Sequence, residues 1–453
     1  MSTEPTTLKS NQEPGAVAEA GYESSPATLS IPDKFVRRIL IAIVVVAACA
    51  ELSYTTVNIS AMPVFIRSIH LEDRWIALAA ASFILFEGVL KSPFGVLGDR
   101  IGRKPLIMTG PAVSIVTCLL TPHIHNPYLL ILLRILDGVG AAALWPSAFS
   151  LIGDYVPERR RATAMSFFNL AYLLGLALGP ILGGGVNDWC FRHLAITFNQ
   201  SKEASFYVAS VLFLITTLVA GVCIPHIRDV PHAHPTVGES GLDLNSFRSM
   251  LSRMPMHLLM TFTTFSGIGL IMTYVKIFTL ETFHLSETHF GALLIGPALI
   301  IASLSVPLGT TGDRIGKAKA VKLGIGLCAL SYWILLSHFQ EWSLIVFGSL
   351  LGIGFIIAFP AWMALVSSIC GTSQRGAAIG AVGTAQGVGA ILGVVISSKL
   401  YELPAMQIGP IPVPAHGLPF LACGIMLAIS FLLAMTTVRD PVSGAPLGEC
   451  ATD

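Results

Sequence analysis

The sequence predicts an all-α polytopic membrane protein, with twelve transmembrane helices in two pseudo-symmetric six-helix bundles. Three observations support this fold class: the composition, a series of long apolar runs, and an internal repeat. The chain has 453 residues, of which 53% are hydrophobic and only 12% are charged. Soluble domains carry about 25% charged residues, so the composition favours a protein that folds in a lipid bilayer.

The apolar runs are long enough to cross a bilayer, which takes about 20 residues of α-helix. The runs are continuous rather than alternating, which excludes a membrane-spanning β-barrel. We expect twelve helices, at 36–61, 75–97, 106–124, 127–152, 162–186, 204–225, 255–280, 288–310, 319–338, 342–369, 375–401 and 417–438.

The polar segments divide the chain into domains. Residues 1–33 are rich in Ser, Thr, Pro, Glu and Ala and lack an apolar run, so we expect a disordered cytoplasmic tail. The longest interior gap, 226–254, contains several Pro and Gly residues and links the sixth helix to the seventh. The sequence therefore predicts a first bundle at 34–225, a second bundle at 255–438, and a second cytoplasmic tail at 439–453.

The distribution of cations predicts the orientation in the membrane. When alternate loops are assigned to opposite sides, most of the 27 Lys and Arg residues fall on the side of the amino terminus. Cytoplasmic loops carry such an excess, so we expect both ends of the chain in the cytoplasm, which also requires an even number of helices. The opposite side has only Arg67, Arg74, Arg192, Lys202 and Lys399.

The internal repeat relates the two predicted bundles. The segment GDRIG at 98–102 recurs 214 positions later, at 312–316. The same gapless offset aligns Pro93 with Pro307, Gly138 with Gly352, Gly140 with Gly354, Pro146 with Pro360, Gly175 with Gly389, and Gly179 with Gly393. Two parallel copies of one membrane unit are typical of transporters in which two halves move around a central site.

The segment 95–104 resembles the loop-2/3 motif of the major facilitator superfamily, G-x-L-a-D-[RK]-x-G-[RK]-[RK]. The matching residues are Gly95, Leu97, Gly98, Asp99, Arg100, Gly102, Arg103 and Lys104. The resemblance spans about residues 36–438 and implies a secondary transporter that works by alternating access. It also implies that Asp99 lies near the start of the eleventh helix, around Arg375 and Gly376, and joins the halves when the cytoplasmic side is closed. The cations of the motif are explained equally well as topology signals.

Two further motifs refine the resemblance. The family's fourth-helix motif R-x-x-q-G is similar to residues 134–138, with Asp137 where Gln is usual. The fifth-helix motif G-x-x-x-G-P-x-x-G-G is complete and resembles the twelve-helix drug:proton antiporter branch. It consists of Gly175, Gly179, Pro180, Gly183 and Gly184. Close helix packing alone would explain these small residues, whereas the family implies a bend that resists leak between the halves.

Five charged residues lie within the apolar runs of the predicted first bundle. They are Glu51, Glu87, Lys91, Arg134 and Asp137, and the second half has uncharged residues at the equivalent positions. A charge at mid-bilayer costs about 2.5–3.5 kcal/mol on insertion scales. Glu87 and Lys91, and likewise Arg134 and Asp137, are spaced to pair on one helix face, so local neutralisation is one explanation for them.

Glu51 differs, because the first helix offers it no cation within a turn. A lone carboxylate in a low-dielectric site is easily protonated near neutral pH. Our hypothesis is that Glu51 carries the coupling proton, that Arg134 or the substrate competes for its charged form, and that Glu87 and Asp137 belong to the same proton-coupling set. A permanently protonated, structural Glu51 is the alternative.

Polar and aromatic positions deep in the helices are candidates for the substrate cavity, although each is also explained by packing. Together they suggest a roomy, mostly apolar pocket that suits amphipathic organic molecules better than sugars or phosphates. The candidates are Tyr54, Asn58, Trp145, Asn169, Tyr172, Tyr274, Trp362 and Gln386. The eight cysteines form no CxxC pair, and we expect no metal and no cofactor.

The leading interpretation is a proton-coupled exporter of small lipophilic or cationic organic compounds. One alternative is a proton-coupled symporter that imports a metabolite, and another is a transporter-like receptor that moves nothing. An enzyme is disfavoured, because the sequence has no HExxH motif or phosphate-binding loop. The expected partners are a small-molecule substrate, protons and the lipid bilayer, without nucleic acid. We expect a monomer in the plasma membrane or the bacterial inner membrane.

Overall fold

The structure is a computed structural model of the chain. It describes residues 33–156, 158–194, 196–225, 254–338, 340–369, 375–408 and 411–439. The two predicted tails and the predicted linker at 226–254 lie outside these ranges, apart from Asp33, Met254 and Arg439 at their borders.

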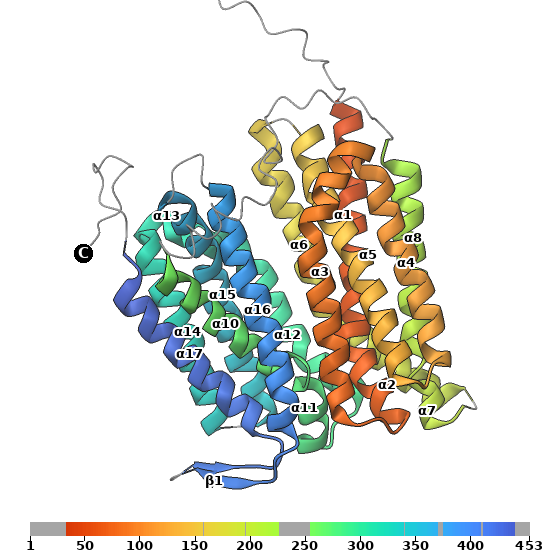
Figure 1. Cartoon of the computed structure of the whole chain (residues 1–453), viewed down its shortest axis with the longest axis vertical. Helices are drawn as coiled ribbons and strands as arrows, with labels where there is room; N and C mark the ends of the chain where they lie inside the picture. Colours follow the sequence, from red (N-terminus) through yellow and green to blue (C-terminus); the bar gives the residue numbers. More distant parts are fainter. Residues whose placement is uncertain are drawn as a thin grey trace, which may run out of the picture.

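The described residues form two helical bundles that lie side by side (Figure 1). The first bundle contains α1 (Asp33–Thr55), the π-helical turn η1 (Thr56–Ala61), α2 (Met62–Ser68), α3 (Asp73–Ile101), α4 (Arg103–Leu120), the 3₁₀ turn η2 (Thr121–His123), α5 (Pro127–Tyr155), α6 (Glu158–His193), α7 (Phe198–Ser201) and α8 (Ala204–Cys223). The second contains α10 (Pro255–Met272), α11 (Val275–Phe283), α12 (Glu287–Gly309), α13 (Thr311–Ile315), α14 (Lys317–Ser337), α15 (Glu341–Ile369), α16 (Arg375–Tyr401) and α17 (Leu418–Thr437).

A short hairpin connects the last two helices. Its strands, β1 (Met406–Ile408) and β2 (Ile411–Val413), pair antiparallel with Met406 opposite Val413. Helix starts follow ordinary capping chemistry: the Asn126 side chain accepts hydrogen bonds from two amides of α5, and Ser286 accepts one from His289 of α12.

The helices have the length and composition of membrane spans. Among the described residues, 10 helices are long and apolar enough to cross a bilayer. Two further predicted runs are also helical. The run at 36–61 forms α1 and η1, and the run at 75–97 forms α3, both in the first bundle. The predicted fold class, an all-α polytopic membrane protein, is therefore confirmed.

The sequence repeat is visible in how the helices pack. In the first bundle, a Cβ atom added to Gly140 of α5 would lie 2.7 Å from the carbonyl oxygen of Gly110 of α4. In the second bundle, a Cβ atom added to Gly354 of α15 would lie 2.6 Å from the carbonyl oxygen of Gly324 of α14. These four glycines correspond at the offset of 214, so each bundle brings the same pair of backbones together.

The bundles meet through two pairs of helices that the repeat also relates. α3 packs against α16, and α6 packs against α12. The bundles lie closest together where α11 and α2 are found, and they lean apart toward α13 (Figure 1). We call the first of these regions the α11 end.

The glycine contacts predict a difference between two substitutions to alanine. Gly140→Ala would force α4 and α5 apart, and overpacking of this kind costs about 1–3 kcal/mol. We expect a lower unfolding temperature for the purified variant, measured by tryptophan fluorescence. The control is Gly88→Ala on α3, where no atom lies within 4 Å of an added Cβ and where alanine favours the helix. Equal unfolding temperatures of the two variants would contradict the packing.

Candidate functional site

A buried ion pair lies between α4, α5 and η1 in the first bundle. Arg134 pairs with Asp137 one turn later on α5, and both side chains are almost completely buried. Arg134 also donates a hydrogen bond of 2.9 Å to Oδ1 of Asn58, while Thr117 donates one of 3.3 Å to Asp137. The guanidinium carbon lies 5.6 Å from the ring centre of Phe83. The predicted residues Asn58, Arg134 and Asp137 thus form one connected cluster.

Glu87 and Lys91 form a second ion pair on α3. The distance between Nζ and Oε1 is 2.7 Å, and the lysine side chain is about half exposed. The spacing of four residues places both groups on one face of the helix, as the sequence predicts.

Glu51 on α1 is 5% exposed. Among the described residues it has no ion-pair partner, and the Tyr172 hydroxyl of α6 lies beside its carboxyl group. Glu87 and Lys91 are the charged groups that act on it electrostatically. The backbone of Gly175 lies directly against Glu51, since an added Cβ would be 2.8 Å from Cβ of the glutamate. Three predicted site residues, Glu51, Tyr172 and Gly175, therefore lie together.

The fifth-helix motif packs against the π-helical turn in the facing helix. α6 continues through Pro180, while η1 departs from α-helical geometry opposite it. Thr55 donates to the carbonyl oxygen of Gly175 at 3.0 Å, and Thr56 donates to that of Gly179 at 3.1 Å. Gly183 lies against Ser60 on the same face. The last glycine, Gly184, instead lies against the backbone of Glu287 in the second bundle, so the motif reaches the interface between the halves.

The loop motif at 95–104 forms a tight turn between α3 and α4. Gly102 has a φ of 90°, and Gly316, its equivalent in the second bundle, has a φ of 96°. Glycine adopts such left-handed values without strain. Arg103 donates to the carbonyl oxygen of Gly95 at 3.3 Å, and Lys104 donates to that of Gly221 at 2.6 Å. Gly98 is buried and Arg100 is exposed.

The predicted contact of Asp99 falls on undescribed side chains. The side chain of Asp99 and those of residues 371–380 are outside the described part of the chain. A contact between Asp99 and the start of α16 stays a prediction.

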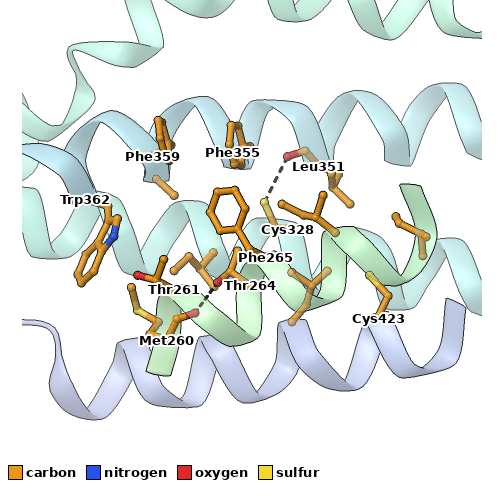
Figure 2. A pocket seen from close by; sticks show the side chains of 15 residues that line it. Met260, Thr261, Thr264, Phe265, Cys328, Leu351, Phe355, Phe359, Trp362 and Cys423 are labelled. Carbon is orange, nitrogen blue, oxygen red and sulfur yellow. Dashed lines mark hydrogen bonds between the residues drawn. The ribbon is translucent and has the colours of Figure 1, made fainter. Parts of the chain in front are cut away.

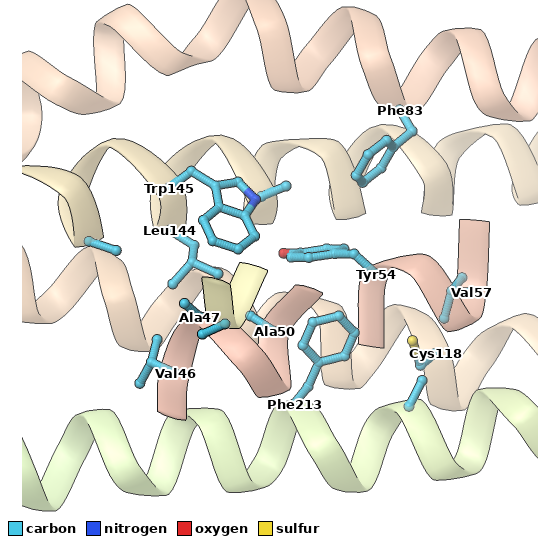
Figure 3. Close-up of a cluster of buried hydrophobic side chains, with 14 of the residues drawn as sticks. Val46, Ala47, Ala50, Tyr54, Val57, Phe83, Cys118, Leu144, Trp145 and Phe213 are labelled. Carbon is cyan, nitrogen blue, oxygen red and sulfur yellow. The ribbon is translucent and has the colours of Figure 1, made fainter. Parts of the chain in front are cut away.

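Tyr54 and Trp145, predicted for the cavity, belong to an aromatic cluster inside the first bundle (Figure 3). The ring of Tyr54 contacts those of Phe83, Trp145 and Phe213, with ring centres 5.8, 6.4 and 4.8 Å away. Its hydroxyl shares a hydrogen bond of 3.1 Å with Ser114. Both predicted residues are buried, and the space around them is filled by rings.

The other predicted cavity residues are spread over the molecule. Asn169 is exposed on α6. Tyr274 is buried at the α11 end, where its hydroxyl donates to the carbonyl oxygen of Asp73 at 2.8 Å. Gln386 of α16 has a buried Nε2 without a hydrogen-bond partner among the described residues, and Trp362 of α15 lines a cavity in the second bundle.

That cavity lies between α10, α14, α15 and α17 (Figure 2). Its volume is about 80 Å³. None of the described residues that line it is charged. The walls are mostly aliphatic side chains and four rings, those of Phe265, Phe355, Phe359 and Trp362, together with two threonines, two cysteines and a methionine.

The α11 end holds a buried cluster that the sequence did not reveal. Lys202 of the first bundle and Lys276 of the second both donate to Glu287, at 2.5 and 2.6 Å. The three side chains are 2%, 1% and 5% exposed. Lys276 also donates to the backbone and side-chain oxygens of Ser60 at 2.9 and 2.8 Å. Asn187 donates to Glu287 at 3.3 Å, so both bundles supply groups to one carboxylate.

A second, more exposed cluster lies at the same end. Arg67 of the first bundle binds Asp73 through two hydrogen bonds of 2.8 Å and pairs with Glu281 of the second bundle. Tyr401 donates to Glu281 at 3.2 Å and stacks on Tyr274 with 4.2 Å between ring centres. Arg67 and Glu281 are equivalent positions in the repeat, so their contact lies close to the pseudo-two-fold axis.

Comparison with known proteins agrees with these features. The family model described as Major Facilitator Superfamily matches residues 43–278 and 257–450. The inner membrane transport protein YajR of Escherichia coli is 27% identical over 388 residues, covering 82% of this chain and 76% of YajR. Multidrug resistance protein 2 of Bacillus subtilis is 22% identical over 382 residues, covering 83% of this chain and 90% of that protein.

A solved structure shows the same fold. A bacterial homologue of the human lysosomal transporter Spinster superposes with a TM-score of 0.70 at 16% identity, covering 92% of this chain and 100% of that chain. Two repeated six-helix units, intact loop-2/3 and fifth-helix motifs, and a family match over nearly the whole chain all agree. The chain belongs to the Major Facilitator Superfamily and is a multi-pass membrane transporter.

Proposed function

We propose that this transporter exports small lipophilic or cationic organic compounds in exchange for protons. The observation that carries the proposal is the environment of Glu51, the one acid among Glu51, Glu87 and Asp137 without an ion-pair partner in the described part of the chain. An ionised carboxylate that is buried and unpaired is unfavourable, so Glu51 binds a proton when the site is closed to water. When the site opens, water and substrate can compete with the proton for the Glu51 carboxylate.

The other charged residues near this site are paired with one another. Arg134 is neutralised by Asp137 and held by Asn58, and Lys91 is neutralised by Glu87. A cationic substrate or a proton is therefore attracted to the remaining carboxylate rather than to the paired ones. This arrangement supports exchange of one for the other, which is the basis of antiport.

Two further observations support export. The fifth-helix motif at 175–184 is complete and resembles that of drug:proton antiporters. A relative that shares 83% of this chain's length is named as a multidrug resistance protein. We propose the same class of activity for this chain, in the bacterial inner membrane or a plasma membrane.

The distribution of cations supports an orientation with both ends of the chain in the cytoplasm. The α11 end then faces outward, and the cluster around Glu287 closes the outer side. Alternating access requires this cluster to separate when the outer side opens, because it joins groups from both bundles.

The first prediction concerns proton coupling. Cells that lack other efflux systems should accumulate less of a fluorescent cationic dye when they express the wild-type protein, and a protonophore should abolish the difference. Glu51→Gln cannot exchange a proton, so we expect accumulation close to that of cells without the transporter. The control is Glu341→Gln, an exposed acid at the start of α15, which should export like wild type.

The outcomes separate the alternatives. Export by Glu51→Gln that still responds to the protonophore would overturn the role of Glu51. Higher dye accumulation in wild-type cells than in empty cells would indicate import in symport with protons. No effect of the wild-type protein on a broad panel of dyes, despite confirmed membrane expression, would contradict export of this substrate class.

The second prediction concerns the outer closure. Glu287→Gln leaves two buried lysines without a counter-charge, and loss of one member of a buried ion pair costs about 3–5 kcal/mol. Since each 1.4 kcal/mol is a factor of ten, the population should shift strongly toward separation of the bundles at the α11 end. Spin labels at Asn199 and Glu402, both exposed there, should show longer distances in electron–electron double resonance, in a background without the native cysteines.

The matched control is Glu281→Gln. Glu281 also joins the bundles, but its side chain is half exposed, and exposed ion pairs contribute only about 0–1 kcal/mol. The distances between the same two spin labels in this variant should stay closer to those in the wild type. Equal shifts in the two variants would show that burial of the Glu287 cluster is not what holds the outer side closed.

A further inference from the structure

We propose that a groove between α1 and α8 binds an anionic phospholipid, at the end of the first bundle opposite the α11 end. Lys34, Arg37 and Arg38 line this groove together with apolar side chains, and its volume is about 550 Å³. Clefts that hold small ligands measure about 300–1,000 Å³. The inference goes beyond the proposed export and does not rest on it, because it concerns lipid bound to one bundle.

The cations and the apolar part of the groove follow one another along a single face of α1. Arg37, Ile41 and Val45 are spaced four residues apart, and such positions lie on the same side of a helix. Ile41 and Val45 are about 6 and 12 Å farther along the helix axis than Arg37, and Ile41 is 55% exposed. The groove thus presents cations at the membrane surface and hydrocarbon below them, in the same order as the headgroup and acyl chains of a phospholipid.

The other wall of the groove is the end of α8. Val219 and Cys223 line it, and the neighbouring Val222 is 71% exposed. α8 packs against α1, α4 and α6 of its own bundle, and Figure 1 shows it at the edge of the first bundle that is farther from the second bundle. The groove therefore faces the surrounding lipid rather than the interface between the bundles.

Two of the three cations have no counter-charge in the described part of the chain. Arg38 donates to the carbonyl oxygen of Val222 at 2.9 Å and so caps the end of α8. Lys34 and Arg37 are exposed, and none of the described side chains that line the groove is acidic. The guanidinium of Arg37 can donate two parallel hydrogen bonds to a phosphate group, and Lys34 adds a second positive charge. Basic pockets between membrane helices bind anionic headgroups in this way.

Cations at this end of the bundles are also explained as signals that orient the chain in the membrane. That explanation applies equally to Lys319 and Lys322, which have the same spacing at the start of α14 in the second bundle. Lipid binding, in contrast, requires cations above an apolar groove. Lys34 and Arg37 can therefore be tested against a matched pair of cations.

Native mass spectrometry of the purified full-length protein provides the test, since a bound lipid is identified by its mass. The protein would be titrated with phosphatidylglycerol, which carries one negative charge, and with phosphatidylcholine of the same acyl chains, which has no net charge. We expect one molecule of phosphatidylglycerol to bind about tenfold more tightly than phosphatidylcholine.

Three variants separate the charges from the groove. Each cation near the membrane surface contributes about fivefold to the binding of anionic lipid, so Lys34→Gln with Arg37→Gln should weaken binding of phosphatidylglycerol roughly 10- to 30-fold. Lys319→Gln with Lys322→Gln is the control and should bind like wild type. Ile41→Trp keeps every charge but narrows the groove, and should weaken binding roughly fourfold or more, the equivalent of one buried methylene group.

Equal losses in the two double variants would overturn the proposal, since binding would then depend only on total charge. Full affinity in Ile41→Trp would overturn the role of the groove. Gel filtration and thermal unfolding would detect a double variant that fails to fold, and Ile41→Trp with wild-type protein then decides. Equal affinities of the wild type for the two lipids would also contradict the proposal.

Two further measurements identify the occupant of the groove. Inorganic phosphate in large excess should not displace phosphatidylglycerol, because it lacks acyl chains, and displacement would mean that the site takes a free anion instead. Residues 1–33 contain five acids and one lysine, so this segment is the competing occupant. Lipid binding that appears only after residues 1–30 are removed would overturn the proposal for the full chain.

Discussion

A buried carboxylate, Glu287, joins the two bundles at the α11 end. Glu287 accepts Lys202 from the first bundle and Lys276 from the second, and all three groups are removed from water. Desolvation of such charges costs several kcal/mol for each ion and is repaid only by good geometry. The pairing is therefore favourable when the bundles are in close register and is lost when they separate, where water solvates the charges again. This favours two distinct arrangements of the bundles over a continuum.

The two halves share one arrangement of helices and differ in the side chains at equivalent positions. Both bundles place a glycine pair between equivalent helices, and both end a helix with a left-handed glycine, at Gly102 and Gly316. Within that shared frame, Glu51 of the first bundle corresponds to Phe265 of the second. The same backbone position thus carries an acid in one half and an aromatic ring in the other.

Most of the fold could be predicted from the sequence, because the bilayer demands long apolar helices and the repeat fixes how they are grouped. The pairing of Arg134 with Asp137 and of Glu87 with Lys91 also follows from helical spacing. Which side of each helix faces the partner bundle could not be predicted. Helices that are apolar all round carry no amphipathic pattern, so the ring contacts of Tyr54 and Trp145 inside the first bundle could not be predicted.

The cluster at Glu287 was missed for a related reason. Lys202 and Glu287 lie at helix starts, where charged residues are common at the membrane surface, and Lys276 lies near the outer end of its predicted helix. Each alone is explained by a side chain that reaches water. Only the approach of α6 and α12 brings them together and buries them.

The contact of Arg67 with Glu281 has a consequence for the origin of the two-bundle chain. These residues occupy equivalent positions of the repeat, close to the axis that relates the halves. In a symmetric dimer of one bundle, the same position would face its own copy, and arginine would meet arginine or glutamate would meet glutamate. Like charges repel, so this ion pair cannot exist in a homodimer. It requires two copies whose sequences differ at this position, as the two halves of this chain do.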